Sequence, residues 1–216
     1  MRRGALNTFH TMQMHAEHWS KVIQCCMVEV ERAGSLFAKL DEQKKELDDD
    51  NHEAEAKELQ NLLFSDPRIP PFFRSIVEML KVVAMIRFVA KEASIESLDD
   101  KMEELSQGWA LISDRLSHDV PASMAGISED NPLPPNGDAV TPPEAKTMLG
   151  ELEAGRNVDT LGDTSTWCTL SLLPVRPATD LVSFGGCTYH PRCGNLWLNC
   201  VSQDPPIAND SVMDLF

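Results

Sequence analysis

Apolar residues recur at helical spacing along the first part of the chain. Between residues 8 and 47 they fall at steps of three, four or seven and form one stripe: Trp19, Val22, Cys26, Ala33, Phe37 and Leu40. A stripe of this period predicts one long amphipathic helix. The acidic run Leu47–Asn51 should end it, because aspartate and asparagine favour caps and turns. A short helix that carries Leu59, Leu62 and Leu63 on one side is expected next.

Two further helices are predicted after the proline-rich break at Ser65–Pro71. Residues 72–94 are apolar on nearly all sides at their centre, which is typical of a buried bundle helix. Ser97, with Asp100 three residues on, is a candidate capping box for the last helix. Apolar residues then follow at steps of four and three, as in a packed seam: Leu98, Met102, Leu105, Trp109, Ile112 and Leu116. The pattern predicts an all-α fold, an antiparallel helical bundle over residues 8–118.

The pattern stops at residues 119–166, which contain no aromatic residue. This segment holds six prolines, with nine acidic and two basic residues. It has too little apolar surface to offset the entropy of ordering, so we expect an acidic, proline-rich disordered linker. The whole chain has a formal net charge of −15, which disfavours binding to nucleic acid or to an acidic membrane surface.

Aromatic residues, cysteines and glycines return at residues 167–206, ahead of a tail at 207–216. Leu181–Phe184 reads as a strand, the pair Gly185-Gly186 as a turn, and a short helix should carry Leu196, Trp197 and Cys200. We therefore expect a small Cys/His-containing β-hairpin/helix module after the linker. A cytosolic unit of this size has little core of its own, and such units commonly bind zinc.

The spacing His190-x-x-Cys193 can present a nitrogen and a sulfur atom to one metal ion. Cys168 is a candidate third ligand, and either Cys187 or Cys200 a fourth. Ser171 stands where a second cysteine of a Cys-x-x-Cys pair would be expected. Two interpretations remain open. Either one structural zinc is held by Cys168, Cys187, His190 and Cys193, or the module binds no cofactor and packs on the bundle with buried thiols.

Other chemistry is poorly supported by the sequence. His15 and His18 lie three residues apart, but together with His10 they lack the pattern of a metalloprotease helix. No phosphate-binding loop, nucleophile elbow or paired-carboxylate signature is present, so we do not expect an enzyme. No secretory signal follows Arg2 and Arg3, and the longest apolar run, Val82–Ile86, is too short to span a bilayer. Six cysteines without a disulfide framework favour the cytosol.

Three stretches carry a family resemblance: "PPFFRSIVEMLKVVAMIRFVAKEAS", "MEELSQGWALISDRL" and "YHPRCGNLWLNCVSQDPP". They resemble the C-terminal region of the gamma-synergin family, over residues 8–118 and 167–206. The resemblance implies a cytosolic accessory protein of clathrin-coated membranes that binds the gamma-adaptin adaptor complex. The family's EH domain and its acidic-aromatic adaptor-binding repeats have no counterpart here, so the resemblance implies a C-terminal fragment or a short isoform.

The sequence ends in Asp214-Leu215-Phe216, an acidic residue before two bulky apolar ones. Short peptides of this kind can dock into shallow grooves on adaptors or clathrin. We therefore expect a non-enzymatic scaffold in clathrin-linked vesicle traffic at the trans-Golgi network and endosomes, with protein partners and without a transmembrane segment. The alternative is a LIM-like zinc-finger regulator of protein interactions. A hydrolase with a scattered site is the remotest option.

Overall fold

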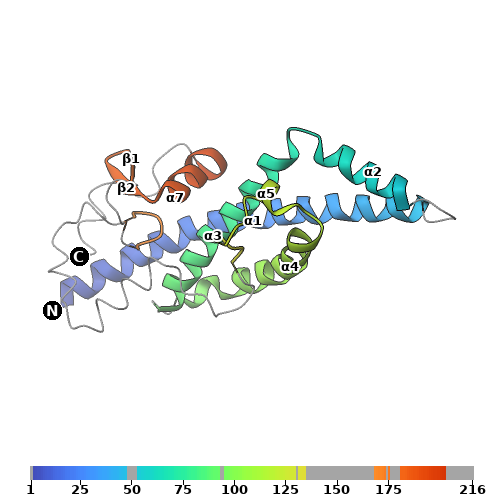
Figure 1. Cartoon of the computed structure of the whole chain (residues 1–216). Helices are drawn as coiled ribbons and strands as arrows, with labels where there is room; N and C mark the ends of the chain where they lie inside the picture. The colour runs from blue at the N-terminus through green and yellow to red at the C-terminus, as the bar shows by residue number, and fades with distance from the viewer. Residues whose placement is uncertain are drawn as a thin grey trace.

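The computed structural model describes residues 2–47, 53–92, 95–129, 131–134, 168–173, 175 and 181–202, with the side chains of the first helix described from His15 to Lys45. The described chain is mostly helical and ends in a small hairpin and a short helix (Figure 1). The predicted all-α bundle with a hairpin/helix module is therefore confirmed.

Helix α1 (Arg2–Leu47) is the longest element, and the whole fold is arranged along it (Figure 1). All six residues of the predicted apolar stripe are buried, with Trp19, Val22 and Ala33 at 0% exposure. The helix ends at Leu47, where the acidic run was predicted to end it. Helix α2 (Glu53–Phe64) then runs back along the end of α1 and buries Phe64, while Leu62 stays 65% exposed.

Helix α3 (Ile69–Glu92) is the most buried helix of the bundle, as its apolar centre predicted. It starts earlier than the sequence suggested, because Pro70 and Pro71 lie inside its first turn. The amide groups of a first turn have no partner within the helix, so prolines at these positions cost no hydrogen bond. The non-helical segment between α2 and α3 is thus confined to residues 65–68, where the Asp66 carboxylate accepts hydrogen bonds from Arg68.

All six residues of the predicted seam are buried: five lie in helix α4 (Asp99–His118), and Leu98 directly precedes it. The predicted capping box at Ser97 is not formed. A 3₁₀ turn, η1 (Glu96–Leu98), leads directly into the helix, so Leu98 stands at the cap position and no side chain caps α4. Because the backbone is already helical through the turn, Ser97 is not positioned to cap the amides beyond it.

Helices α1 and α4 lie side by side and run in the same direction. Helix α3, which comes between them in the sequence, runs in the opposite direction (Figure 1). The parallel direction follows from contacts along their length: Ser20 with Lys101 near the start, and Asp41 with Arg115 near the end. Between these contacts the two backbones come close at Gly108, where an added Cβ would lie 2.9 Å from Val30 Cγ1. A side chain at position 108 would push the two helices apart.

The first part of the predicted linker is packed against α3. Helix α5 (Ala122–Ala125) buries Ala125 and ends at Gly126 in the left-handed conformation, with φ of 68°. Arg74 of α3 donates to the carbonyl oxygens of Met124 and Ser123 at 3.1 and 3.3 Å. Residues 119–129 and 131–134 thus differ from the disordered linker expected there. The remainder of that linker, Asp130 and residues 135–166, lies outside the described residues, and its disorder stays a prediction.

The terminal module is an antiparallel hairpin followed by a helix. Strand β1 (Val182–Phe184) pairs with β2 (Cys187–Tyr189), and Phe184 faces Cys187 across the turn. Gly185 and Gly186 have φ of 56° and 74°, as a two-residue hairpin turn requires. Helix α7 (Pro191–Leu196) then continues into one π-helical turn, η5 (Trp197–Val201). The predicted strand, glycine turn and helix are all present.

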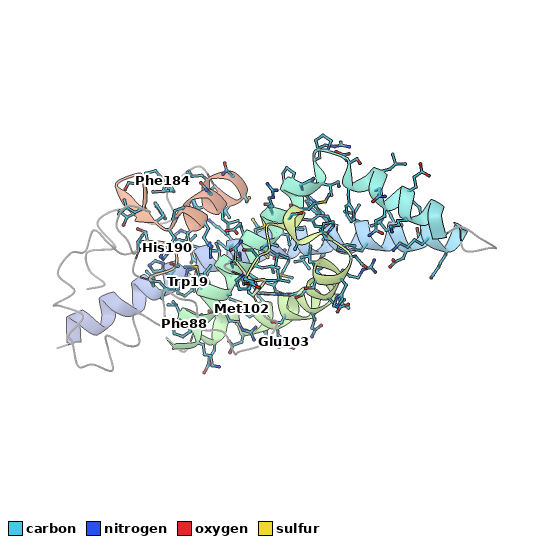
Figure 2. All side chains as sticks on the ribbon, in the orientation of Figure 1. Trp19, Phe88, Met102, Glu103, Phe184 and His190 are labelled. Carbon is cyan, nitrogen blue, oxygen red and sulfur yellow. The ribbon has the colours of Figure 1, made fainter. Side chains whose placement is uncertain are left out.

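The module packs on α1 and α3 (Figure 1). The Trp19 indole Nε1 donates to the Leu170 carbonyl oxygen at 2.7 Å, across 151 residues of sequence. The His18 ring meets the Trp197 ring edge-on, with 5.3 Å between centroids. On the α3 side, Arg192 pairs with Glu78 at 3.2 Å. Bundle and module therefore share one core, and Figure 2 labels Trp19 of the bundle and His190 of the module.

Candidate metal centre

The loop at residues 168–173 brings the first half of the centre into place. The loop turns tightly on itself, because the Leu172 amide donates to the Cys168 carbonyl at 2.8 Å and the Cys168 amide donates to the Leu173 carbonyl at 2.9 Å. Leu172 has φ of 57°, a left-handed conformation that non-glycine residues rarely adopt. The Thr169 amide donates to the Thr188 carbonyl at 2.8 Å and so fixes the loop to β2. Cys168 and Ser171 are held on the module by this turn.

The second half comes from the start of α7. His190 is the residue before the helix, Pro191 occupies its first position, and Cys193 lies in its first turn. Proline suits that position because its fixed φ is already helical and it lacks only an amide that has no partner there. The Gly194 amide donates to the His190 carbonyl at 2.9 Å, which closes the turn. This geometry directs the side chains of His190 and Cys193 to one side.

Cys168, His190 and Cys193 converge in the core of the module. One ligand atom from each lies within 4.8 Å of the other two. Cys168 and Cys193 are fully buried and His190 is 6% exposed. Ser171, also fully buried, places its hydroxyl oxygen 3.2 Å from His190 Nδ1 and donates its amide hydrogen to Cys168 Sγ at 3.4 Å. Four polar side chains thus face one point.

The two thiols of this cluster have opposite proton affinities. Burial raises the pKa of Cys168, but hydrogen bonds from Cys193, His190 and Ser171 and the charge of His190 hold it well below its usual range. The hydrogen bond to Cys168, and then burial, raise the pKa of Cys193 well above its usual range. A thiolate at Cys168 that accepts a hydrogen bond from the protonated Cys193 thiol accounts for both directions. Thiolate is the form of cysteine that binds metal ions.

Of the four ligands predicted from the sequence, the structure brings together three. Cys187 is buried on β2 but does not belong to the cluster. Cys200, the alternative fourth ligand, is exposed in η5, and its carbonyl oxygen lies 3.5 Å from Cys25 Sγ of α1. The side chain of His10 and the residues Asp214, Leu215 and Phe216 lie outside the described part, so the tail motif stays a prediction.

Sequence reasoning missed the part played by Ser171, which it treated as the loss of a ligand. In the structure the Ser171 side chain stands in the cluster. The spacing Cys168-x-x-Ser171, the same as His190-x-x-Cys193, was the signal that could have found it. His15, in contrast, is buried beside Trp19 with ring centroids 5.6 Å apart, and belongs to no metal-binding group among the described residues.

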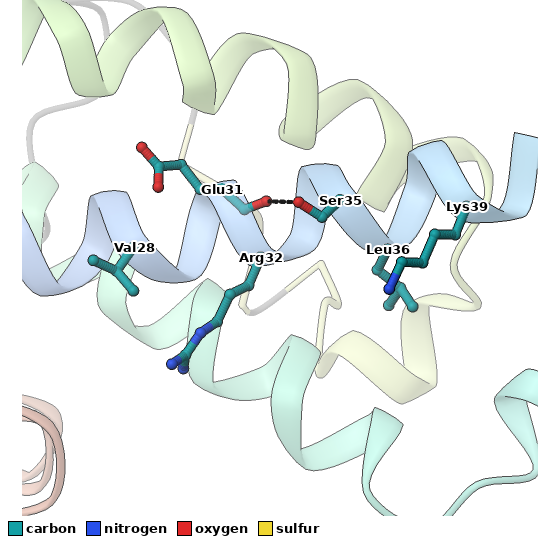
Figure 3. A pocket seen from close by; sticks show the side chains of 6 residues that line it. All are labelled: Val28, Glu31, Arg32, Ser35, Leu36 and Lys39. Atoms are coloured by element: carbon teal, nitrogen blue, oxygen red, sulfur yellow. Dashed lines mark hydrogen bonds between the residues drawn. The ribbon is translucent and has the colours of Figure 1, made fainter.

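The surface hollows of the described chain offer less chemistry than this cluster. Figure 3 shows the hollow on α1, which is lined by one helix alone: Val28, Glu31, Arg32, Ser35, Leu36 and Lys39. The Ser35 hydroxyl donates to the Glu31 backbone carbonyl at 3.0 Å and is not paired with a base. A second hollow lies between the end of α3 and the start of α4, near Met102 and Glu103 (Figure 2). Neither hollow places a nucleophile beside a general base.

Comparison with known proteins shows that the chain matches the family model "Synergin gamma, C-terminal domain" over residues 51–208. The matched range spans α2 to α5 and the terminal module, and leaves out α1. Neither the curated proteins nor the solved structures contain a match. Among the described residues, no helix is long and apolar enough to cross a membrane. The match covers most of the sequence, and the chain belongs to the family of the synergin gamma C-terminal domain.

Proposed function

We propose that the chain is a non-enzymatic accessory protein of clathrin-linked vesicle traffic at the trans-Golgi network and endosomes. The observation that carries the proposal is the family match over residues 51–208. The synergin family has an adaptor-type role in trafficking. The same match extends over both the bundle and the Cys/His module, which the structure packs into one core. We therefore propose that both parts act together in presenting a surface to protein partners.

The partner of first choice is the gamma-adaptin adaptor complex, with clathrin and other coat components next. The net charge of −15 supports protein partners over nucleic acid. The folded part offers isolated exposed apolar side chains for contact, among them Leu62 on α2 and Leu111 on α4, which is 73% exposed. The Asp214-Leu215-Phe216 motif offers a second mode of contact, in which the acid guides docking and the apolar residues anchor.

The test is capture of coat proteins from cytosol by the full chain, followed by direct binding to the purified gamma-adaptin complex. The matched control is a triple variant, Asp214→Ala with Leu215→Ala and Phe216→Ala. We expect adaptor or clathrin subunits to be enriched over beads without the chain. Loss of that enrichment in the triple variant would assign binding to the tail, and its retention would assign binding to the folded part. If no coat or adaptor subunit is enriched and the purified complex does not bind, the proposal is wrong.

The alternative function, a zinc-finger regulator of protein interactions, is favoured by one observation: the convergence of Cys168, His190 and Cys193. The module does not stand apart as an independent finger, however. Trp197 at its helix is 2% exposed and packs against His18 of α1. Under this alternative, partner binding would depend on the module's own surface and would fail when Cys168 or Cys193 is replaced. The capture experiment with those variants distinguishes the two functions.

A further inference from the structure

The geometry points to one zinc ion bound by Cys168, His190 and Cys193, with the Ser171 hydroxyl at its fourth corner. The site is distinct from the partner-binding function proposed above. Two segments supply it, each with two donors at x-x spacing: the tight loop supplies Cys168 and Ser171, and the start of α7 supplies His190 and Cys193.

The ligand atoms lie close to the separations of a tetrahedral zinc site. Zinc bonds of about 2.0–2.1 Å to nitrogen and oxygen place two such ligands about 3.3 Å apart. The Ser171 oxygen and His190 Nδ1 are 3.2 Å apart. Zinc–sulfur bonds of about 2.3 Å place two thiolates about 3.8 Å apart, and the ligand atoms of Cys168, His190 and Cys193 already lie within 4.8 Å of one another. A closure of about 1 Å or less therefore completes the site.

The donor set selects the metal. Two thiolates with one imidazole suit zinc, because soft sulfur ligands in a tetrahedral arrangement exclude magnesium and calcium, which prefer oxygen. The groups around the proposed ligands are also those expected of a metal site. The Ser171 amide hydrogen bond to Cys168 Sγ is the kind of outer contact that orients a metal-bound thiolate. A purely apolar core has no need of four converging polar side chains, all of which must be taken out of water.

The ion would hold the loop to the helix. The loop contacts α1 because the Leu170 carbonyl accepts the hydrogen bond from Trp19. Helix α7 contacts α3 because Arg192 pairs with Glu78. Zinc at the junction of loop and helix would therefore stabilise the docked module as well as its interior.

The test is metal binding by the full chain, purified metal-free under a reducing phosphine and titrated with Co²⁺ and then Zn²⁺. We expect one equivalent of Co²⁺ to give the visible bands of a tetrahedral site and a sulfur charge-transfer band, both abolished by one equivalent of Zn²⁺. Replacement of an outer-shell group typically weakens metal binding about 10–100-fold, so loss of a ligand in Cys193→Ser should weaken it more than about 100-fold.

Ser171→Cys is the informative variant, because it replaces the proposed hydroxyl ligand by a thiolate and completes a set of three thiolates and one imidazole. It should bind zinc at least about 10-fold more tightly, with a stronger charge-transfer band. The matched controls Cys187→Ser and Cys200→Ser should bind like the parent chain. The inference is overturned if the parent chain does not bind a stoichiometric ion, even where Ser171→Cys does, or if Cys187→Ser loses binding as fully as Cys193→Ser does.

Discussion

The hydrogen bond from Trp19 to Leu170 ties the terminal module to the bundle, and its strength can be measured. Trp19 is fully buried, and its Nε1–H reaches the Leu170 carbonyl at 2.7 Å. Trp19→Phe removes this donor and leaves a buried acceptor without its partner, which costs about 1–3 kcal/mol. The substitution also removes one ring of the indole, so packing is lost at the same time.

Trp109→Phe is the matched control, because it makes the same change at a site without the hydrogen bond. Trp109 on α4 is 3% exposed, and its Nε1 finds no acceptor among the described residues. Both variants lose similar packing, but Trp109→Phe also relieves an unpaired buried donor. Trp19→Phe should therefore lower the free energy of unfolding by at least about 1 kcal/mol more than Trp109→Phe does.

The assay is urea unfolding of the full chain followed by far-UV circular dichroism, because both variants alter tryptophan fluorescence directly. The difference between the two variants, and not either cost alone, reports the hydrogen bond. Equal costs within about 0.5 kcal/mol, or a larger cost for Trp109→Phe, would refute the docking of the loop on Trp19.

Two further predictions concern the bundle. Gly108→Ala should destabilise the fold by about 1–3 kcal/mol in urea unfolding, because its Cβ would lie 2.9 Å from Val30 Cγ1. The control Gly34→Ala, whose added Cβ has its nearest contact at 3.9 Å, should be neutral or stabilising by up to about 1 kcal/mol. A Gly108→Ala variant as stable as Gly34→Ala would contradict the close contact between the helices. Burial, and then the charge of His18, lower the pKa of His15 to about 3, so the unfolded chain takes up a proton near pH 6.5 that the folded chain does not, and stability falls as the pH falls from about 6.5 toward 3. The difference in unfolding free energy between the parent chain and His15→Leu should change by up to about 1.4 kcal/mol per pH unit in that window, and a difference independent of pH would show that His15 is not buried.

The helices could be predicted well from the sequence, because their buried apolar residues recur at the regular spacing of a helix face. The seam from Leu98 to Leu116 and the stripe from Trp19 to Leu40 are all buried, since spacing alone decides which residues share a helix face. The turn at Gly185-Gly186 was equally readable, because few residues other than glycine accept its backbone angles. The start of α3 could not be predicted in the same way. Prolines interrupt the interior of a helix but are tolerated in its first turn, so they do not tell where the helix begins.

The candidate metal centre was predicted only in part, because its geometry depends on contacts distant in sequence. Cys168 lies far from His190 along the chain, and only the fold shows that Ser171 accompanies it while Cys187 does not. The docking of the module was left open as well, since no local pattern records that Trp19 binds Leu170 across 151 residues.

The Cys/His module and the helical bundle form one folded unit. Native-state hydrogen exchange on the full chain tests this most directly, because it gives an opening free energy for each amide. We expect the amides of residues 187–197 to exchange with the same free energy of opening as those of the buried middle of α3. Exchange of the module at a free energy several kcal/mol below that of α3 would show that the module opens on its own and is not one folded unit with the bundle.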